Sequence, residues 1–188
     1  MTNEQIIWQF LYDKFKNVYG VAAMMGNLFA ESSLNPVSAN GIYSKGLTNV
    51  EYTRRVDEGE KDDFATDGIA YGLVQWCYKT RKQGLLDLAR AQGKSIGDLN
   101  LQLDYMWKEL QKYKTVLKAI YNATNVREVS DIIMLKYEKP SNTNEYMRVR
   151  RANYGEKYLQ KYGDPTININ VKLETATTLF DELSKAID

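Results

Sequence analysis

The feature that most constrains the fold of this chain is the spacing of its apolar residues, which follows the period of an α-helix along most of the sequence. In the first segment, Ile6, Phe10 and Leu11 fall on one helical face. Thr2 and Gln5 precede that face with the spacing of a capping box. No strong strand pattern precedes TININV, and that segment is better explained as a linker. The chain is therefore predicted to be mainly α-helical.

Capping residues and helix breakers divide the chain into further helices. Pro36 ends the second one, because the residue before a proline disfavours the helical conformation. Thr48 with Glu51, and Asn142 with Glu145, have the spacing of capping boxes that begin two others. The helices predicted after the first cover residues 19–31, 49–57, 80–92, a segment opened by Ser95 and Asp98, 116–121, a segment from Asn125 to Pro140, and a last one that runs to Tyr162.

Residues 35–72 depart from this helical pattern, because they are rich in Gly, Ser, Asn and Asp around the short helix at 49–57. A long insertion of this kind inside a compact domain is often functional. We predict one helical domain over 1–163, with a small irregular or short β insert between the second and third long helices. Residues 164–188 are predicted to be a linker and an amphipathic helix, which is either a docking helix or the stub of a larger protein.

The residue content limits the available chemistry. The chain has no histidine, which excludes Ser-His-Asp and Cys-His catalysis and removes the commonest zinc ligand. Its one cysteine, Cys77, has no partner for an intramolecular disulfide. We expect acid–base chemistry to fall to carboxylates, Tyr or Lys, with no metal or organic cofactor. The net charge of +1 predicts neither nucleic-acid nor membrane binding.

Three segments stand out as a candidate site, and the first, GNLFAESSLNP, contains Glu31. Glu31 lies in the last turn of its predicted helix, at the edge of the apolar face. Partial burial and the negative end of the helix dipole both favour its neutral form. A glycosidase needs a carboxyl that keeps its proton near neutral pH. Taken alone, however, Glu31 is better explained as an ordinary surface residue at a helix end.

The second segment, AYGLVQW, has side chains suited to sugars. Gln75 offers a donor and an acceptor for hydroxyl and N-acetyl groups. Tyr71, Trp76 and Tyr78 could supply ring faces for stacking on a pyranose. A tryptophan beside a glycine turn is usually structural, so this segment alone does not establish a sugar site.

Taken together, Glu-Ser followed by Asn-Pro and then Gly-Leu-x-Gln resemble the signature of the goose-type lysozyme and soluble lytic transglycosylase superfamily. The chain resembles the phage tail lysozyme family more closely. That family shows GxxGNxxAESxxNP, YGLxQW, an RK-containing helix, QLxYLWxEL and a late YExP. Here VAAMMGNLFAESSLNP, YGLVQW, Arg81-Lys82, QLDYMWKEL and YEKP occur in that order, between about Tyr19 and Tyr162. Cys77 stands where family members often have Thr.

The resemblance implies a lysozyme-like, mainly α (α+β) fold and bacterial peptidoglycan as the substrate. It implies that Glu31 is the general acid that cleaves the β-1,4 bond between N-acetylmuramic acid and N-acetylglucosamine. Hydrolase and lytic transglycosylase are not distinguished, because water attacks in one and the sugar's own 6-hydroxyl in the other. The alternative is a non-catalytic cell-wall-binding or structural module of a phage tail or conjugation apparatus.

No motif identifies a second catalytic carboxylate. Asp67 is the weak candidate, because it lies closest to YGLVQW among the acidic residues of the insert. Glu138, in the third segment KYEKPSNTNEYMRVRRANYG, either faces the cleft or pairs with an arginine of the last helix, and the structural pair is favoured. The residues expected to contact substrate are Gln75, Tyr71, Trp76, Ser32, Tyr154 and Glu138.

The start of the chain, MTNEQIIWQF, lacks the basic region and cleavage site of a signal peptide. We therefore expect a phage particle, a holin or a secretion apparatus to deliver the protein to the cell wall. The expected partners are peptidoglycan and other phage tail or secretion components, without nucleic acid or membrane.

Overall fold

The fold is described from a computed structural model that covers residues 1–41 and 46–164. This part of the chain is mainly helical, as predicted. The predicted linker and helix at the end of the chain lie outside the described residues, apart from Asp164. The helices are α1 (Asn3–Phe15), α2 (Val18–Ser32), α3 (Asn49–Asp57), α4 (Lys79–Gln92), α5 (Leu99–Leu110), α6 (Lys114–Tyr121), α7 (Val126–Ile133), the π-helix η2 (Met134–Glu138) and α8 (Glu145–Tyr162).

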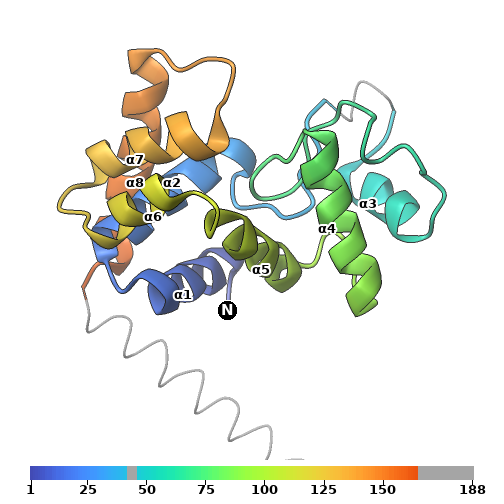
Figure 1. The fold of residues 1–188 in the computed structure, drawn as a ribbon, viewed down its shortest axis with the longest axis horizontal. Helices are drawn as coiled ribbons and strands as arrows, with labels where there is room; N and C mark the ends of the chain where they lie inside the picture. Colours follow the sequence, from blue (N-terminus) through green and yellow to red (C-terminus); the bar gives the residue numbers. More distant parts are fainter. Residues whose placement is uncertain (42–45, 165–188) are drawn as a thin grey trace, which may run out of the picture.

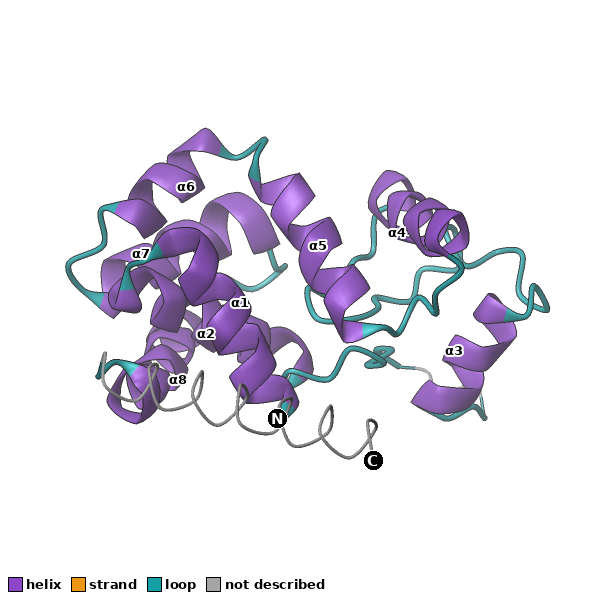
Figure 2. Ribbon diagram, turned by 90° about the horizontal axis from the view of Figure 1, so that it is seen from below, coloured by secondary structure: helices purple, strands orange, loops and turns teal. Residues whose placement is uncertain are grey.

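The helices separate into two groups. Figure 1 shows α1, α2, α6, α7 and α8 packed together on one side, α3 and α4 on the other, and α5 between them; the perpendicular view in Figure 2 agrees. Helix α2 packs mainly against α8 and α7 and is buried from Gly20 through Leu28. A helix that is apolar on all sides belongs in a core. The carboxyl end of α2, which carries Glu31, is therefore held by its neighbours.

The capping residues predicted from the sequence begin their helices, with one correction. Thr2 and Gln5 form the predicted capping box, and the side chain of Thr48 accepts a hydrogen bond from the Glu51 N–H. Helix α8 is capped by Asn144, which accepts from the Met147 N–H, and not by Asn142 as predicted. The Asn142 side chain instead accepts from the Asn144 N–H, so it shapes the turn before the helix.

The insert between α2 and α4 contains α3 and turns, with no extended strand among its described residues. Two isolated β-bridges join Ala39 to Tyr71 and Tyr71 to Trp76. Residues 71–76 thus form a tight turn, closed by two backbone hydrogen bonds between Tyr71 and Trp76. The small β content matches the prediction, although the second bridge reaches beyond residue 72.

Among the helices of residues 1–41 and 46–164, none has the length together with the apolar composition that a membrane span requires.

Candidate active site

The three sequence segments meet at one cavity of about 540 Å³. Glu31 lines it from the end of α2, Gln75 from the turn of the insert, and Glu138 from the end of η2. Cys77 and Tyr78 line it as well, and both side chains are exposed. Segments more than 100 residues apart in the sequence therefore supply the walls of a single cleft.

Glu31 is held in the cleft wall by an arginine of α8. The Nη2 atom of Arg151 lies 2.5 Å from Oε1 of Glu31, and the Arg151 side chain is only 3% exposed. Its Nη1 atom donates to Oδ1 of Asn27, which is also buried. Asn27 is anchored in turn, because its Nδ2 atom donates to Ser130 and to the backbone of α2. The carboxylate of Glu31 thus has a fixed position and a buried cation beside it.

Glu138 has a different environment. Its Oε1 atom is buried and accepts no hydrogen bond within the described part of the chain. The pairing with an arginine of α8 that the sequence favoured is not formed, because Arg151 pairs with Glu31 instead. Burial, and then the negative charge of Glu31, raise the pKa of Glu138 well above its usual range. Both effects disfavour the charged form of the carboxyl.

Gln75 presents one end of its amide to the cleft. Its backbone has a φ of 50°, in the left-handed region that non-glycine residues rarely occupy. The side chain fits this turn because its Nε2 atom donates to the carbonyls of Gly72 and Ser38. Since these bonds occupy the donor, the carbonyl oxygen of the amide remains for a ligand hydroxyl or N–H.

Ser32 acts within the cleft wall and not at its surface. The residue is buried, and its hydroxyl lies 3.0 Å from the carbonyl of Leu73 and 3.2 Å from that of Leu28. It therefore joins the last turn of α2 to the YGLVQW turn. This contact holds together two segments that line the cavity.

A buried carboxylate connects three of the segments around the cleft. Glu109 of α5 accepts hydrogen bonds from Trp76, Arg81 and Tyr137. Arg81 also lines the cleft, and its guanidinium lies 5.1 Å from the centre of the Tyr137 ring. Glu109 thereby ties the turn of the insert, α4 and η2 together.

Four residues expected at the site lie elsewhere. Tyr71 and Trp76 are fully buried, so their ring faces contact protein and not the cleft. Asp67 pairs with buried Lys82 at 2.6 Å and accepts a hydrogen bond from Tyr52. Tyr154 packs on Phe29 and accepts from Arg150, outside the lining of the cleft.

The sequence analysis missed Arg151, Asn27 and Glu109 as parts of this arrangement. Asn27 and Glu109 lie inside the quoted motifs GNLFAES and MWKEL, so the motifs did carry a signal. A charged or amide residue on the buried face of a helix needs a partner. That rule could have marked Glu109, whereas nothing local distinguishes Arg151 from the arginines beside it.

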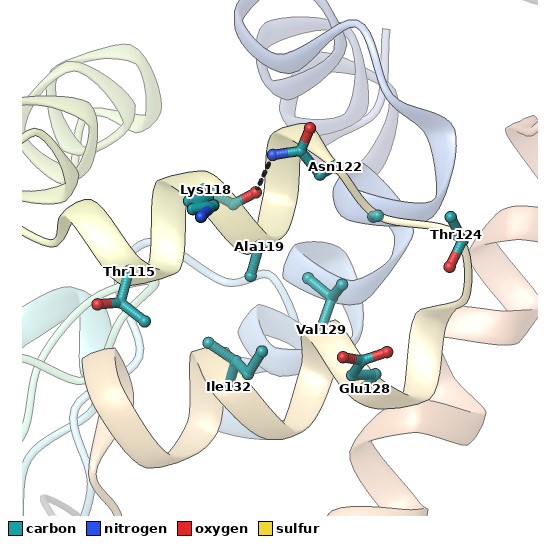
Figure 3. Close-up of a pocket in the computed structure, with 9 residues that line it drawn as sticks. Thr115, Lys118, Ala119, Asn122, Thr124, Glu128, Val129 and Ile132 are labelled. Carbon is teal, nitrogen blue, oxygen red and sulfur yellow. Dashed lines mark hydrogen bonds between the residues drawn. The ribbon is translucent and has the colours of Figure 1, made fainter.

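A second cavity, of about 340 Å³, lies between α6 and α7 (Figure 3). Lys118, Ala119, Glu128, Val129 and Ile132 are among the residues that line it. The Nδ2 atom of Asn122 donates to the carbonyl of Lys118 at its edge. None of the three sequence segments contributes to this cavity, so it is not the candidate active site.

Comparisons with known proteins indicate the family of this chain. "Morphogenesis protein 1" of Bacillus phage B103 is 26% identical over 178 residues, which cover 89% of this chain and 42% of that protein. The chain therefore spans less than half the length of this relative. The model of the phage tail lysozyme family matches residues 2–162, which include every wall of the cleft. This chain belongs to the phage tail lysozyme family.

Proposed function

We propose that this domain cleaves the glycan strands of bacterial peptidoglycan at the β-1,4 bond between N-acetylmuramic acid and N-acetylglucosamine, with Glu31 as the general acid. The observation that carries the proposal is the convergence of Glu31, Gln75 and Glu138 on one cavity. Membership of the phage tail lysozyme family supports the same substrate.

The environment of Glu31 suits a proton donor of fixed position. Arg151 engages only Oε1, so the other oxygen of the carboxyl is available to a glycosidic oxygen in the cleft. When that oxygen receives the proton, the bond from C1 to the oxygen breaks and its electrons stay with the leaving sugar. Gln75 can hold an N-acetyl or hydroxyl group beside this bond, and exposed Tyr78 can offer a ring face.

The attacking group completes the reaction in one of two ways. If water attacks C1, the product carries a reducing end, whereas attack by the sugar's own 6-hydroxyl gives a 1,6-anhydro end. Glu31 serves as the acid in both reactions. Mass spectrometry of the muropeptides released from purified walls distinguishes the two products.

A second candidate function is a non-catalytic wall-binding or structural module. The observation that favours it is the name of the relative from phage B103, which describes morphogenesis. A module of that kind would keep the cleft and bind walls without cutting them.

The substitution Glu31→Gln tests the proposal. Glutamine keeps the size and the hydrogen bond to Arg151 but cannot donate a proton, so lysis should slow by on the order of 10²-fold or more. The measurement is the fall in turbidity of purified walls, together with sedimentation binding and thermal unfolding. Glu156→Gln, on the exposed side of α8, is the control and should lyse walls normally. Lysis by Glu31→Gln at the native rate would reject Glu31 as the acid.

A further inference from the structure

Glu31 and Glu138 line the same cavity but differ in their partners. Glu31 faces the buried guanidinium of Arg151 at 2.5 Å. Glu138 has a buried oxygen without a hydrogen-bond partner, and an unpartnered buried charge is costly. A cation therefore compensates a charge on Glu31, whereas no hydrogen-bond partner compensates a charge on the buried oxygen of Glu138.

The charged groups around Glu138 do not reverse this arrangement. Burial and the charge of Glu31 are the largest influences, and both raise the pKa of Glu138. Arg81 and Arg151 act in the opposite direction, and Glu109 adds to the increase. The guanidinium of Arg81 is already engaged by Glu109, and that of Arg151 by Glu31. Neither arginine forms an ion pair with Glu138.

We propose that Glu31 and Glu138 form a carboxyl pair that shares one proton, which Glu138 holds in the free cleft and supplies to Glu31 for catalysis. Glu138 is thus a positioning residue for the proton, and Glu31 remains the group that touches the glycosidic oxygen. This inference rests on the proposed function. It names a source for the proton that Glu31 donates, because the ion pair between Glu31 and Arg151 does not itself supply one.

The proton balance is closed over one cycle. Glu138 releases its carboxyl proton and becomes a carboxylate, while Glu31 gains a proton. Glu31 then gives that proton to the glycosidic oxygen as the bond to C1 breaks. The attacking water or 6-hydroxyl loses a proton when it bonds to C1, and this proton returns to the pair.

A shared proton predicts a particular pH profile. While the pair holds one proton, the fraction on Glu31 does not depend on pH, so the rate of wall lysis should be flat around neutral pH. In Glu138→Gln, Glu31 must take its proton from solution while the charge of Arg151 remains beside it. The rate of that variant should fall about 10-fold for each unit of rising pH over the range where the native rate is flat.

The profiles of wild type, Glu138→Gln, Glu138→Asp and the control Glu156→Gln should therefore be measured on purified walls. Glu138→Asp keeps a titratable carboxyl and should restore a flatter profile. A Glu138→Gln profile parallel to that of wild type would give Glu138 a purely structural role and overturn the proposal. Loss of lysis at every pH would make Glu138 itself the donor and would overturn it too.

A second measurement does not depend on activity. Carbon-13 NMR of glutamate-labelled protein, with Glu138 assigned from Glu138→Gln, follows its protonation directly. The pKa of Glu138 should lie well above its ordinary range in the native protein and should fall in Glu31→Gln, because the neighbouring charge is gone. Titration of Glu138 in its ordinary range would overturn the shared proton, even if Glu31→Gln is inactive. Active Glu31→Gln, in contrast, would reject the proposed function itself.

Discussion

Glu109 joins three parts of the chain that are distant in sequence, because its carboxylate accepts from Trp76, Arg81 and Tyr137. Arg81 lines the cleft from α4, buried Trp76 ends the turn of the insert, and Tyr137 precedes Glu138 in η2. The carboxylate is nearly buried, with a side-chain exposure of 9%. At the scale of single residues, such buried acceptors decide whether the cleft keeps its shape.

Glu109→Gln should therefore destabilise the fold. The change leaves Arg81 without a counter-charge in a buried setting, for which the expected cost is about 3–5 kcal/mol. Urea unfolding, followed by circular dichroism, measures the free energy of unfolding of each variant. Glu145→Gln is the matched control, since Glu145 pairs with Arg127 at the surface and should cost less than about 1 kcal/mol. Equal costs for the two variants would contradict the role of Glu109.

Asp67 provides a second test at this scale. Burial opposes its charge, but hydrogen bonds from Lys82, Tyr52 and the Ile69 N–H outweigh burial and lower the pKa of Asp67. A carboxyl whose pKa is lowered on folding stabilises the protein above its unfolded pKa. That contribution is lost as the pH falls through the folded pKa.

Asp67→Asn should thus reduce stability at pH 7 by about 3 kcal/mol or more, because buried Lys82 loses its counter-charge. The difference from wild type should shrink under acid conditions. Asp63→Asn, an exposed neighbour that pairs with Lys61, is the control. Folded Asp67→Asn should lyse walls at the native rate, and a folded but inactive variant would return Asp67 to the catalytic candidates.

At the scale of elements, the crossing of α2 and α8 places Arg151 beside Glu31. The helices meet at Gly26 and Gly155, where a methyl group on Gly26 would lie 2.5 Å from the backbone of both Arg151 and Gly155. The absence of a side chain at Gly26 therefore permits the close approach. A larger residue would separate the two helices and move Arg151 away from Asn27 and Glu31.

Gly26→Ala should destabilise the protein by about 1–3 kcal/mol, the usual range for overpacking a core. It should also slow wall lysis in the folded protein, because the helix that carries Arg151 is displaced. Asn153→Ala, on the exposed face of α8, is the control and should change neither property. Thermal unfolding and turbidity assays of both variants test this, and a native melting temperature for Gly26→Ala would refute the close packing.

At the scale of the whole molecule, α8 closes the core against the start of the chain. Tyr162 packs on Trp8 with ring centres 5.2 Å apart, and its hydroxyl donates to Glu4. The family match also ends at residue 162. A chain cut after Asp164 should accordingly unfold cooperatively and lyse walls like the longer one. If a cut there abolishes folding, the last residues contribute to the core.

A cut after Leu159 supplies the contrast for that experiment. It removes Tyr162 and with it the ring contact and the hydrogen bond to Glu4. This shorter chain should be less stable than the one that ends at Asp164, as measured by the midpoint of thermal unfolding. Equal midpoints would show that Tyr162 does not close the core.

Sequence patterns account for the helical character of the chain, most helix boundaries and some of the residues that line the cleft. These depend on interactions within about four residues, such as the capping of α1 by Thr2 and the apolar period of α2. The family motifs added Glu31, Gln75 and Glu138, which the structure brings to one cavity. The one capping error, Asn142 for Asn144, arose because both asparagines precede the same helix.

Packing between distant elements, in contrast, settles which charges are paired and which rings are buried. Arg151 lies 120 residues from Glu31 in the sequence, and it is one of three arginines in its segment, so local spacing could not select it. Tyr71 and Trp76 alternate with cleft residues in one turn, where a φ of 50° at Gln75 sets the direction of the neighbouring side chains. Ion pairing and ring burial both depend on how distant elements pack. A buried polar group is costly unless packing brings a partner within reach.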